Sequence, residues 1–203
     1  GILALCIALF PFSLLGNSLE TRIFAEPRFV LVRVAEGLHH PRALAHIGHG
    51  RILISERRGT VHVLDQGVLK PVSGVPAIPA TGQGGLLDIA LHPEFSYNHR
   101  VYFSHTAASG DATVTAVSRA RLAPPGTGGR PGWRLEGWER ILTLSNRGTS
   151  GLHFGSRLAF DAAGFLYVSV GERFVMQDAQ NSATHAGKTL RVRADGSVPP
   201  DNP

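Results

Sequence analysis

Two stretches of the sequence repeat one strand–turn–strand pattern: RALAHIGHGRILISER at Arg42–Arg57 and RLAFDAAGFLYVSVGER at Arg157–Arg173. In each, an arginine opens an apolar strand, a glycine-containing turn follows, and the second strand carries a serine shortly before a Glu-Arg pair. A looser third copy, LLDIALHPEFSYNHRVYFSH, occupies Leu86–His105 between them. The recurrence of one unit indicates a repeat architecture.

The chain after about residue 27 consists of short candidate strands separated by Gly, Pro, Asn and Asp. The strands are enriched in β-branched or aromatic residues, and no later segment keeps a 3.6-residue hydrophobic period, so we predict a nearly all-β domain. The candidate strands are Phe29–Val34, Ala43–Ile47, Arg51–Glu56, Thr60–Leu64, Leu86–Leu91, Arg100–His105, Thr113–Leu122, Arg140–Leu144, Ser156–Asp161, Phe165–Val170 and Lys188–Arg193.

Four-stranded units that recur at intervals of roughly 40–60 residues are typical of the blades of a β-propeller. The equivalent serines Ser55, Ser104 and Ser169 mark three such units. A β-sandwich is the alternative, but it does not require the same unit to recur. Propellers close with about four to eight blades, and this chain accounts for roughly two to three. We therefore expect residues 26–203 to be an incomplete β-propeller domain, truncated at the C-terminus.

The N-terminal segment GILALCIALFPFSLLG contains sixteen residues without a charge. A membrane span needs about 20 apolar residues and would not favour Pro11, so the segment fits the apolar part of a secretory signal peptide better. We predict a partial signal peptide at residues 1–25, a periplasmic or secreted protein, and no stable membrane span in the mature form. A buried core helix is the alternative. Cys6 is the single cysteine, which excludes a disulfide within the chain.

The formal net charge of +5 raises the question of nucleic-acid binding. The basic residues are scattered, and no run exceeds the pair Arg57-Arg58. A nucleic-acid surface requires basic residues gathered on one face, so a solvated surface explains the charge better, and we predict no nucleic-acid partner.

Gln83 and His153 each place a polar side chain among small residues. Gln83 lies in TGQGG, where glycines let the backbone approach a ligand and the amide can both donate and accept hydrogen bonds. His153 lies in SGLHFGSRLAF, with glycines nearby and an apolar strand behind it. An imidazole with an ordinary pKa of about 6.5 is a natural general base, although a water-facing loop residue remains the alternative at both positions.

Three other patterns are weaker. His46 and His49 are three residues apart, but residues at that spacing in a strand point to opposite faces, which disfavours a shared metal. The run Gly148–Gly151 lacks the spacing of a nucleophile elbow, and Gly126–Gly129 lacks the strand-to-helix context of a phosphate loop. We interpret both glycine-containing runs as loops.

Four motifs in order resemble the glucose/sorbosone dehydrogenase family: GQGGLLDIALHPEF, HFGSRLAFDAAGFLYVSVGER, AQNSATHAGKTLRV and DGSVPPDNP. The resemblance runs from about Leu38 to Pro203. These soluble aldose sugar dehydrogenases use pyrroloquinoline quinone (PQQ). The resemblance implies a six-bladed β-propeller, of which this chain holds roughly the first two to three blades, with PQQ in a cleft at the top of the channel.

The resemblance also implies roles for individual residues. His153 matches the family's general base, which takes a proton from the anomeric hydroxyl while hydride passes from C1 to PQQ and a lactone forms. Gln83 matches a glutamine that contacts both sugar and cofactor. Gln177 and Gln180 compete for a further cofactor-binding glutamine. Arg157 either anchors a blade or touches ligand.

The sequence departs from the family pattern in one place and stops short of it in another. Leu152 occupies a position where some members carry an acidic residue, which favours a broad aldose substrate over glucose alone. The residues that grip the PQQ carboxylates and the ligands of Ca²⁺ are expected beyond residue 203. We therefore expect the intact protein to oxidise a sugar and pass electrons to an acceptor, and the 203-residue chain to be inactive alone.

Two other functions remain as alternatives. A non-catalytic extracellular propeller that binds carbohydrate or protein would need neither His153 nor Gln83. A metal-dependent, lactonase-type propeller would need carboxylates that line a channel, and Glu56, Asp88 and Glu172 do not form a convincing set by sequence position.

Overall fold

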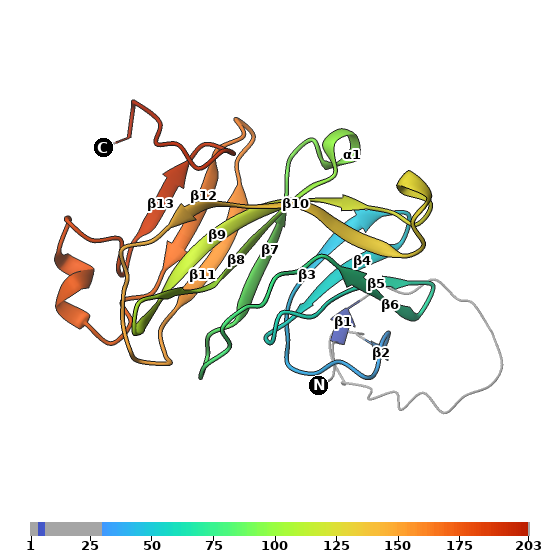
Figure 1. The fold of residues 1–203 in the computed structure, drawn as a ribbon, viewed down its shortest axis with the longest axis horizontal. Helices are drawn as coiled ribbons and strands as arrows, with labels where there is room; N and C mark the ends of the chain where they lie inside the picture. The colour runs from blue at the N-terminus through green and yellow to red at the C-terminus, as the bar shows by residue number, and fades with distance from the viewer. Residues whose placement is uncertain (1–3, 7–29, 203) are drawn as a thin grey trace.

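The computed structural model describes residues 4–6 and 30–202, and the regular secondary structure of this part of the chain is almost wholly β-strand (Figure 1). The strands are β1 (Ala4–Cys6), β2 (Leu31–Arg33), β3 (Pro41–Gly48), β4 (Arg51–Glu56), β5 (Val61–Asp65), β6 (Val68–Ser73), β7 (Leu86–Leu91), β8 (Arg100–Ser109), β9 (Ala112–Ala123), β10 (Trp133–Thr143), β11 (Gly155–Phe160), β12 (Leu166–Val170) and β13 (Thr189–Val192). Three short helical turns, α1 (Phe95–Asn98), η1 (Thr127–Gly129) and η2 (Met176–Gln180), complete the described elements.

The strands form three successive antiparallel units. Strands β3 to β6 make the first and β7 to β10 the second, and a short parallel pairing of β6 with β10 joins them into one eight-stranded sheet. Strands β11 to β13 make the third unit. The first strands of the units, β3, β7 and β11, pack side by side, with β7 between the other two (Figure 1). This arrangement is a β-propeller-like fold, in agreement with the repeat in the sequence.

The second unit owes its position to a strand that is buried on both faces. Successive side chains of β8 point to opposite faces, and both Tyr102 and Phe103 are fully buried. Phe103 packs in an apolar cluster with Leu53 of the first unit, and Tyr102 packs in another with Leu166 of the third unit. Each fully buried aliphatic or aromatic side chain contributes about 1.5–3 kcal/mol, so these two clusters hold the three units together.

The sequence-based prediction misses strand β6 entirely and the first half of strand β10. The structure contains β6, which was not predicted, and extends β10 back to Trp133 from the expected start at Arg140. Strand β6 has a largely exposed pattern and includes Pro71, and β10 contains Gly137, so both lack the continuous β-forming run that marks a strand. Each can form because a neighbouring strand supplies its hydrogen bonds.

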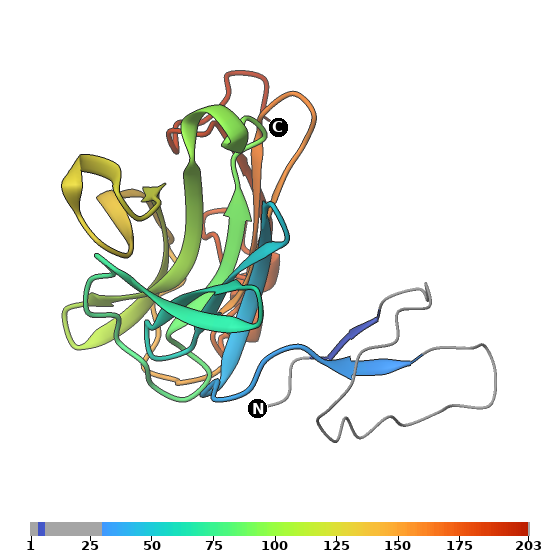
Figure 2. The ribbon, with the colours of Figure 1, turned by 90° about the vertical axis from the view of Figure 1, so that its right-hand side faces the viewer.

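The N-terminal prediction falls mostly outside the described residues. Within it, only Ala4–Cys6 is described, as the strand β1 that pairs antiparallel with β2 in a small sheet set apart from the three units (Figure 2). Among the residues that the structure describes, no helix is long and apolar enough to cross a membrane. The signal peptide at residues 1–25 stays a prediction.

Polar contacts also tie the second unit to the third. Asp88 on β7 is 5% exposed, and its two carboxylate oxygens accept hydrogen bonds from Arg157 Nη1 and the Leu158 backbone amide, both at 2.8 Å. Ser104 Oγ donates to the Ser156 carbonyl at 2.7 Å. Arg157 therefore anchors one inner strand to the next, which was one of its two expected roles.

We expect Asp88→Ala to destabilise the fold by about 1–3 kcal/mol, because the buried Leu158 amide and the Arg157 guanidinium lose their acceptor. Urea unfolding followed by circular dichroism measures the change. The matched control is Asp111→Ala, which removes an exposed carboxylate paired with Arg147 and should change stability by less than about 0.5 kcal/mol. Equal losses in the two variants would contradict a special role for the buried carboxylate.

Candidate functional site

The loops that precede β7 and β11 meet at one end of the inner strands. The Gln83 backbone amide donates to the Gly151 carbonyl at 2.7 Å. The His153 backbone amide donates to Oε1 of the Gln83 side chain at 3.0 Å. The two residues singled out in the sequence are therefore in direct contact, although 70 positions separate them in the chain.

Glycines allow this close approach. A Cβ atom added at Gly82 would collide with the Gly151 carbonyl, and Gly82 also has φ +58°. A Cβ atom added at Gly171 would collide with the His153 carbonyl, so the segment after β12 also lies directly against the loop. Only residues without a side chain permit backbone segments to pack this closely.

The His153 ring is held on two sides. Its Nδ1 atom forms a hydrogen bond with Oε1 of Glu172, and its face stacks on Phe174 with the ring centroids 4.3 Å apart. A neutral ring that donates from Nδ1 keeps its lone pair on Nε2, which is the form a general base requires. The side chain is 44% exposed, so this nitrogen belongs to a residue that a ligand can reach.

Sequence reasoning did not pair Glu172 with His153, the candidate base, but the structure brings the two side chains together. The hydrogen bond from His153 lowers the pKa of the Glu172 carboxyl below its usual value. The carboxylate therefore orients the imidazole and would stabilise it after protonation. The available signal was the Glu-Arg pair that ends both repeats, where Glu56 in the first repeat accepts a hydrogen bond from the His39 amide.

An apolar surface borders His153. Phe174, Val175 and Met176 are all exposed, and so is Leu152, which directly precedes His153. Exposed apolar side chains gathered beside a polar reactive group are typical of a ligand-binding surface.

Two arginines bind carbonyl groups of the Gln83 loop, and Arg157, which is paired with Asp88, adds a charge that Arg42 experiences. Arg42 Nη2 donates to the Gln83 carbonyl at 2.7 Å, and Arg57 Nη1 donates to the Gly82 carbonyl at 2.6 Å. Burial lowers the pKa of Arg42, and the positive charges of Arg57 and Arg157 lower it further. The loop therefore lies in a cationic environment, which favours an anionic ligand group.

The two candidate cofactor glutamines lie on the same short turn. Gln177 and Gln180 belong to η2, which begins two residues after Phe174, and neither is buried. The ammonium group of Lys188 holds this turn by donating to the carbonyls of Asp178 at 2.8 Å and Ala186 at 2.7 Å. Their role in cofactor binding stays a prediction.

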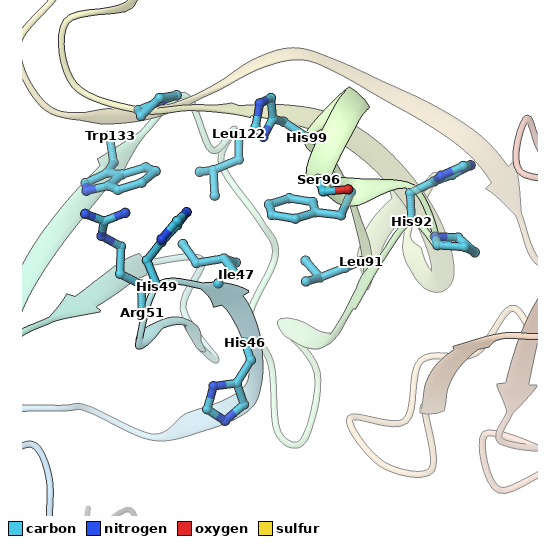
Figure 3. A pocket seen from close by; sticks show the side chains of 14 residues that line it. His46, Ile47, His49, Arg51, Leu91, His92, Ser96, His99, Leu122 and Trp133 are labelled. Atoms are coloured by element: carbon cyan, nitrogen blue, oxygen red, sulfur yellow. The ribbon is translucent and has the colours of Figure 1, made fainter.

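A cavity of about 590 Å³ lies where β3 and β7 end (Figure 3), whereas Gln83 and His153 lie on the loops before β7 and β11 begin. His46 and His49 both line it, but His46 points away from His49 and Arg51. Within the described part of the chain, no three His, Cys, Asp or Glu side chains gather closely enough to hold a metal ion. The cavity therefore gives no support to a metal shared by the two histidines.

Comparison with known proteins identifies the family of the chain. Residues 38–203 match the family described as Glucose / Sorbosone dehydrogenase. The chain therefore belongs to the glucose/sorbosone dehydrogenase family.

The chain is also similar to individual proteins and solved structures. The chain is 38% identical over 207 residues to an uncharacterised Synechocystis protein, covering 92% of this chain and 48% of the relative. It is 34% identical over 191 residues to the aldose sugar dehydrogenase YliI of Escherichia coli, covering 91% and 50%. The solved PQQ-bound aldose sugar dehydrogenase of Streptomyces coelicolor superposes with a TM-score of 0.72 at 31% identity, covering 84% and 49%. The chain spans about half the length of the curated relatives it matches.

We expect His153→Ala to raise the pKa of the Glu172 carboxyl toward its ordinary value of about 4.3, because the variant removes the hydrogen bond that favours the ionised form. Since the native pKa is lowered, the pair stabilises the fold above the unfolded pKa, and this contribution is lost as the pH falls through the native pKa. Carboxyl ¹³C NMR titration measures the shift.

The control for this titration is His46→Ala, which removes an exposed histidine at the other end of the inner strands. It should leave the Glu172 titration unchanged. A Glu172 carboxyl that titrates at the same pH with and without His153 would contradict the pairing.

Proposed function

We propose that the complete protein containing this chain is a PQQ-dependent aldose dehydrogenase that oxidises the C1 hydroxyl of a sugar to a lactone. The observation that carries the proposal is the contact of His153 with both Gln83 and Glu172. Family membership supports the reaction class, and the geometry supports the residues that perform it.

His153 is the proposed base. Oxidation at C1 removes a proton from the anomeric hydroxyl and a hydride from carbon, and Nε2 of a ring fixed through Nδ1 accepts the proton. The positive charge that develops on the imidazole is stabilised by the Glu172 carboxylate. A positioned base of this kind contributes roughly 10²–10⁴-fold to the rate.

Gln83 is proposed to position the reactants. Its Oε1 atom accepts the hydrogen bond from the His153 amide, which leaves the two Nε2 hydrogens of the side chain as donors for sugar or cofactor oxygens. The same contact holds the Gln83 side chain next to His153. One side chain can therefore hold the substrate hydroxyl and limit movement of the loop that carries His153.

PQQ fits the chemistry of this part of the chain. The cofactor carries several carboxylates, and Arg42 and Arg57 place two guanidinium groups against the Gln83 loop. When bound, PQQ supplies the two-electron acceptor for the hydride, a reaction that no side chain can perform. Gln83 and either Gln177 or Gln180 are the proposed cofactor contacts, and the exposed apolar side chains beside His153 would face a planar ring system.

The remaining PQQ clamp and the Ca²⁺ ligands are proposed to lie in the part of the complete protein outside these 203 residues, together with the blades that complete a six-bladed propeller. The location is periplasmic or secreted, the substrate is a small sugar, and an external acceptor reoxidises the cofactor. Leu152 beside the base favours aldoses in general over glucose alone.

The second candidate function is a non-catalytic extracellular propeller that binds carbohydrate or protein. The exposed apolar surface at Phe174 and Met176 is compatible with either function. The ring of His153 held by a carboxylate favours the enzyme, because a binding surface has no need to keep one imidazole nitrogen as a proton acceptor.

We expect His153→Ala in the complete, PQQ-loaded protein to lower kcat for aldose oxidation roughly 10²–10⁴-fold with the fold intact, because proton transfer loses its base. Dye-linked reduction with a panel of aldoses measures the rate, and circular dichroism monitors the fold. The matched control is His46→Ala, which should leave kcat unchanged. An unchanged rate in the His153 variant would refute the base assignment, and no PQQ-dependent turnover of any aldose by the unmodified protein would favour the binding module.

Residues 1–203 alone should show no dye reduction with PQQ and Ca²⁺, because this chain contains the base but not the proposed remainder of the cofactor clamp. The complete protein under the same conditions is the control. Turnover by the 203-residue chain at a rate comparable with the complete protein would contradict this arrangement.

A further inference from the structure

Arg173 is a buried cation beside the base. The residue is only 1% exposed, and burial lowers the pKa of its guanidinium. Among the described residues, no carboxylate forms an ion pair with it, in contrast to Arg134 and Arg157. Burying an unpaired charge is costly unless hydrogen bonds replace those made with water, so this burial requires an explanation.

Backbone carbonyl groups supply the compensation. The guanidinium donates to oxygens on the loop that precedes β11 and on the start of β9. The acceptors are the carbonyls of Asn146 (3.5 Å), Gly148 (3.1 Å), Ser150, Leu152 (3.0 Å) and Thr113 (3.0 Å), and Oγ1 of Thr113 (3.1 Å). Only a planar group with five N–H donors can bind this many carbonyls at once.

Arg173 holds the backbone on both sides of His153. Its Nε atom donates to the Leu152 carbonyl at 3.0 Å, and its backbone amide donates to the His153 carbonyl at 3.3 Å. The guanidinium also lies over the ring of Phe154, 3.7 Å from its centroid. One residue therefore contacts three consecutive residues, with the base in the middle.

The neighbours of Arg173 hold the ring itself. Glu172 forms the hydrogen bond to Nδ1, and Phe174 stacks on the face of the imidazole. His153, Arg173 and Phe174 all have positive φ angles, of 53°, 56° and 69°. A left-handed backbone is unfavourable for non-glycine residues and persists only where surrounding contacts impose it, and at His153 Arg173 provides two of those contacts, to the Leu152 and His153 carbonyls.

The first repeat contains a parallel arrangement. The Arg57 backbone amide donates to the His40 carbonyl at 3.0 Å, and His40 also has a positive φ of 56°. Arg57 Nη1 donates to the Gly82 carbonyl at 2.6 Å, next to Gln83. The arginine at the end of each repeat therefore supports one of the two loops that form the site.

We propose that Arg173 is a positioning residue for the His153–Glu172 pair: its guanidinium fixes the loop that carries the base so that the imidazole meets the carboxylate. This inference rests on the proposed function only for its effect on turnover. Its effect on the geometry of the pair can be measured without any cofactor.

The test uses the complete protein with Arg173→Lys and Arg173→Gln. Lysine keeps the charge but offers three donors from a single nitrogen instead of the planar fork. The matched controls are Arg134→Lys and Arg134→Gln, because Arg134 is also buried and also binds a backbone carbonyl, that of Thr127 at 2.7 Å, but lies on β10 away from the site.

Two measurements separate positioning from simple stabilisation. The first is kcat and KM for aldose oxidation, normalised to folded protein. We expect both Arg173 variants to lower kcat about 10–100-fold with a small change in KM, since misplacement of a base by about 1 Å costs up to roughly 10² in rate. The second is the pKa of the Glu172 carboxyl by NMR in the cofactor-free protein, which should rise toward its ordinary value. The Arg134 variants should change neither quantity.

The outcomes are distinguishable. Loss of thermal stability in the Arg173 variants with unchanged kcat and an unchanged Glu172 pKa would overturn the positioning role. A Glu172 pKa that rises in a protein without aldose turnover would support the positioning role while the proposed enzyme function fails.

A milder variant covers the case in which neither Arg173 variant folds. Thr113→Val removes one acceptor of the guanidinium with little change of volume. It should raise the Glu172 pKa and lower kcat by about 3–10-fold, a smaller effect because the other hydrogen bonds of the guanidinium stay in place. No change in either quantity would again overturn the proposal.

Discussion

The packing of the middle unit against both of its neighbours is the constraint on which the rest of the structure depends. Strand β8 is buried on both faces, so Phe103 belongs to the cluster shared with the first unit and Tyr102 to the cluster shared with the third. Apolar burial on two sides brings the inner strands β3, β7 and β11 together. The polar bridge through Asp88 then aligns β7 with β11, because its carboxylate binds both a side chain and a backbone amide of the next strand.

The site follows from that alignment. The inner strands begin at the same end of the assembly, so the loops that precede them meet there, and Gln83 contacts His153 across 70 residues of sequence. Glycines at positions 82 and 171 allow the backbones to touch, and arginines that bind carbonyl groups hold the loops in place. The His153 imidazole therefore lies on a backbone held by several hydrogen bonds, although it belongs to a loop.

Much of this arrangement was accessible from the sequence, but unevenly. The repeat predicted the hairpins β3–β4, β7–β8 and β11–β12, because strands with strong apolar alternation carry their own signal. Strand β6 and the first half of β10 were missed because Pro71 and Gly137 interrupt the β-forming pattern of the sequence. Both strands depend on a neighbouring strand for their hydrogen bonds. Gln83 and His153 were identified as a pair of interest, whereas Glu172 was considered only as a metal ligand and set aside. Arg173 was seen only as the last residue of a repeat.

The sequence by itself determined the class of fold, the family and the two loops that matter, because these depend on local composition, on residue spacing and on ordered motifs. Only the tertiary structure decided which carboxylate contacts His153 and which cation binds the loop that carries it. Glu172 and Arg173 are adjacent in the chain, yet one side chain reaches the imidazole while the other is buried beneath the loop. The two side chains take different directions because Arg173 and Phe174 both have left-handed backbone angles and because carbonyl groups such as that of Thr113 bind the guanidinium. Neither feature has a local signal in the sequence.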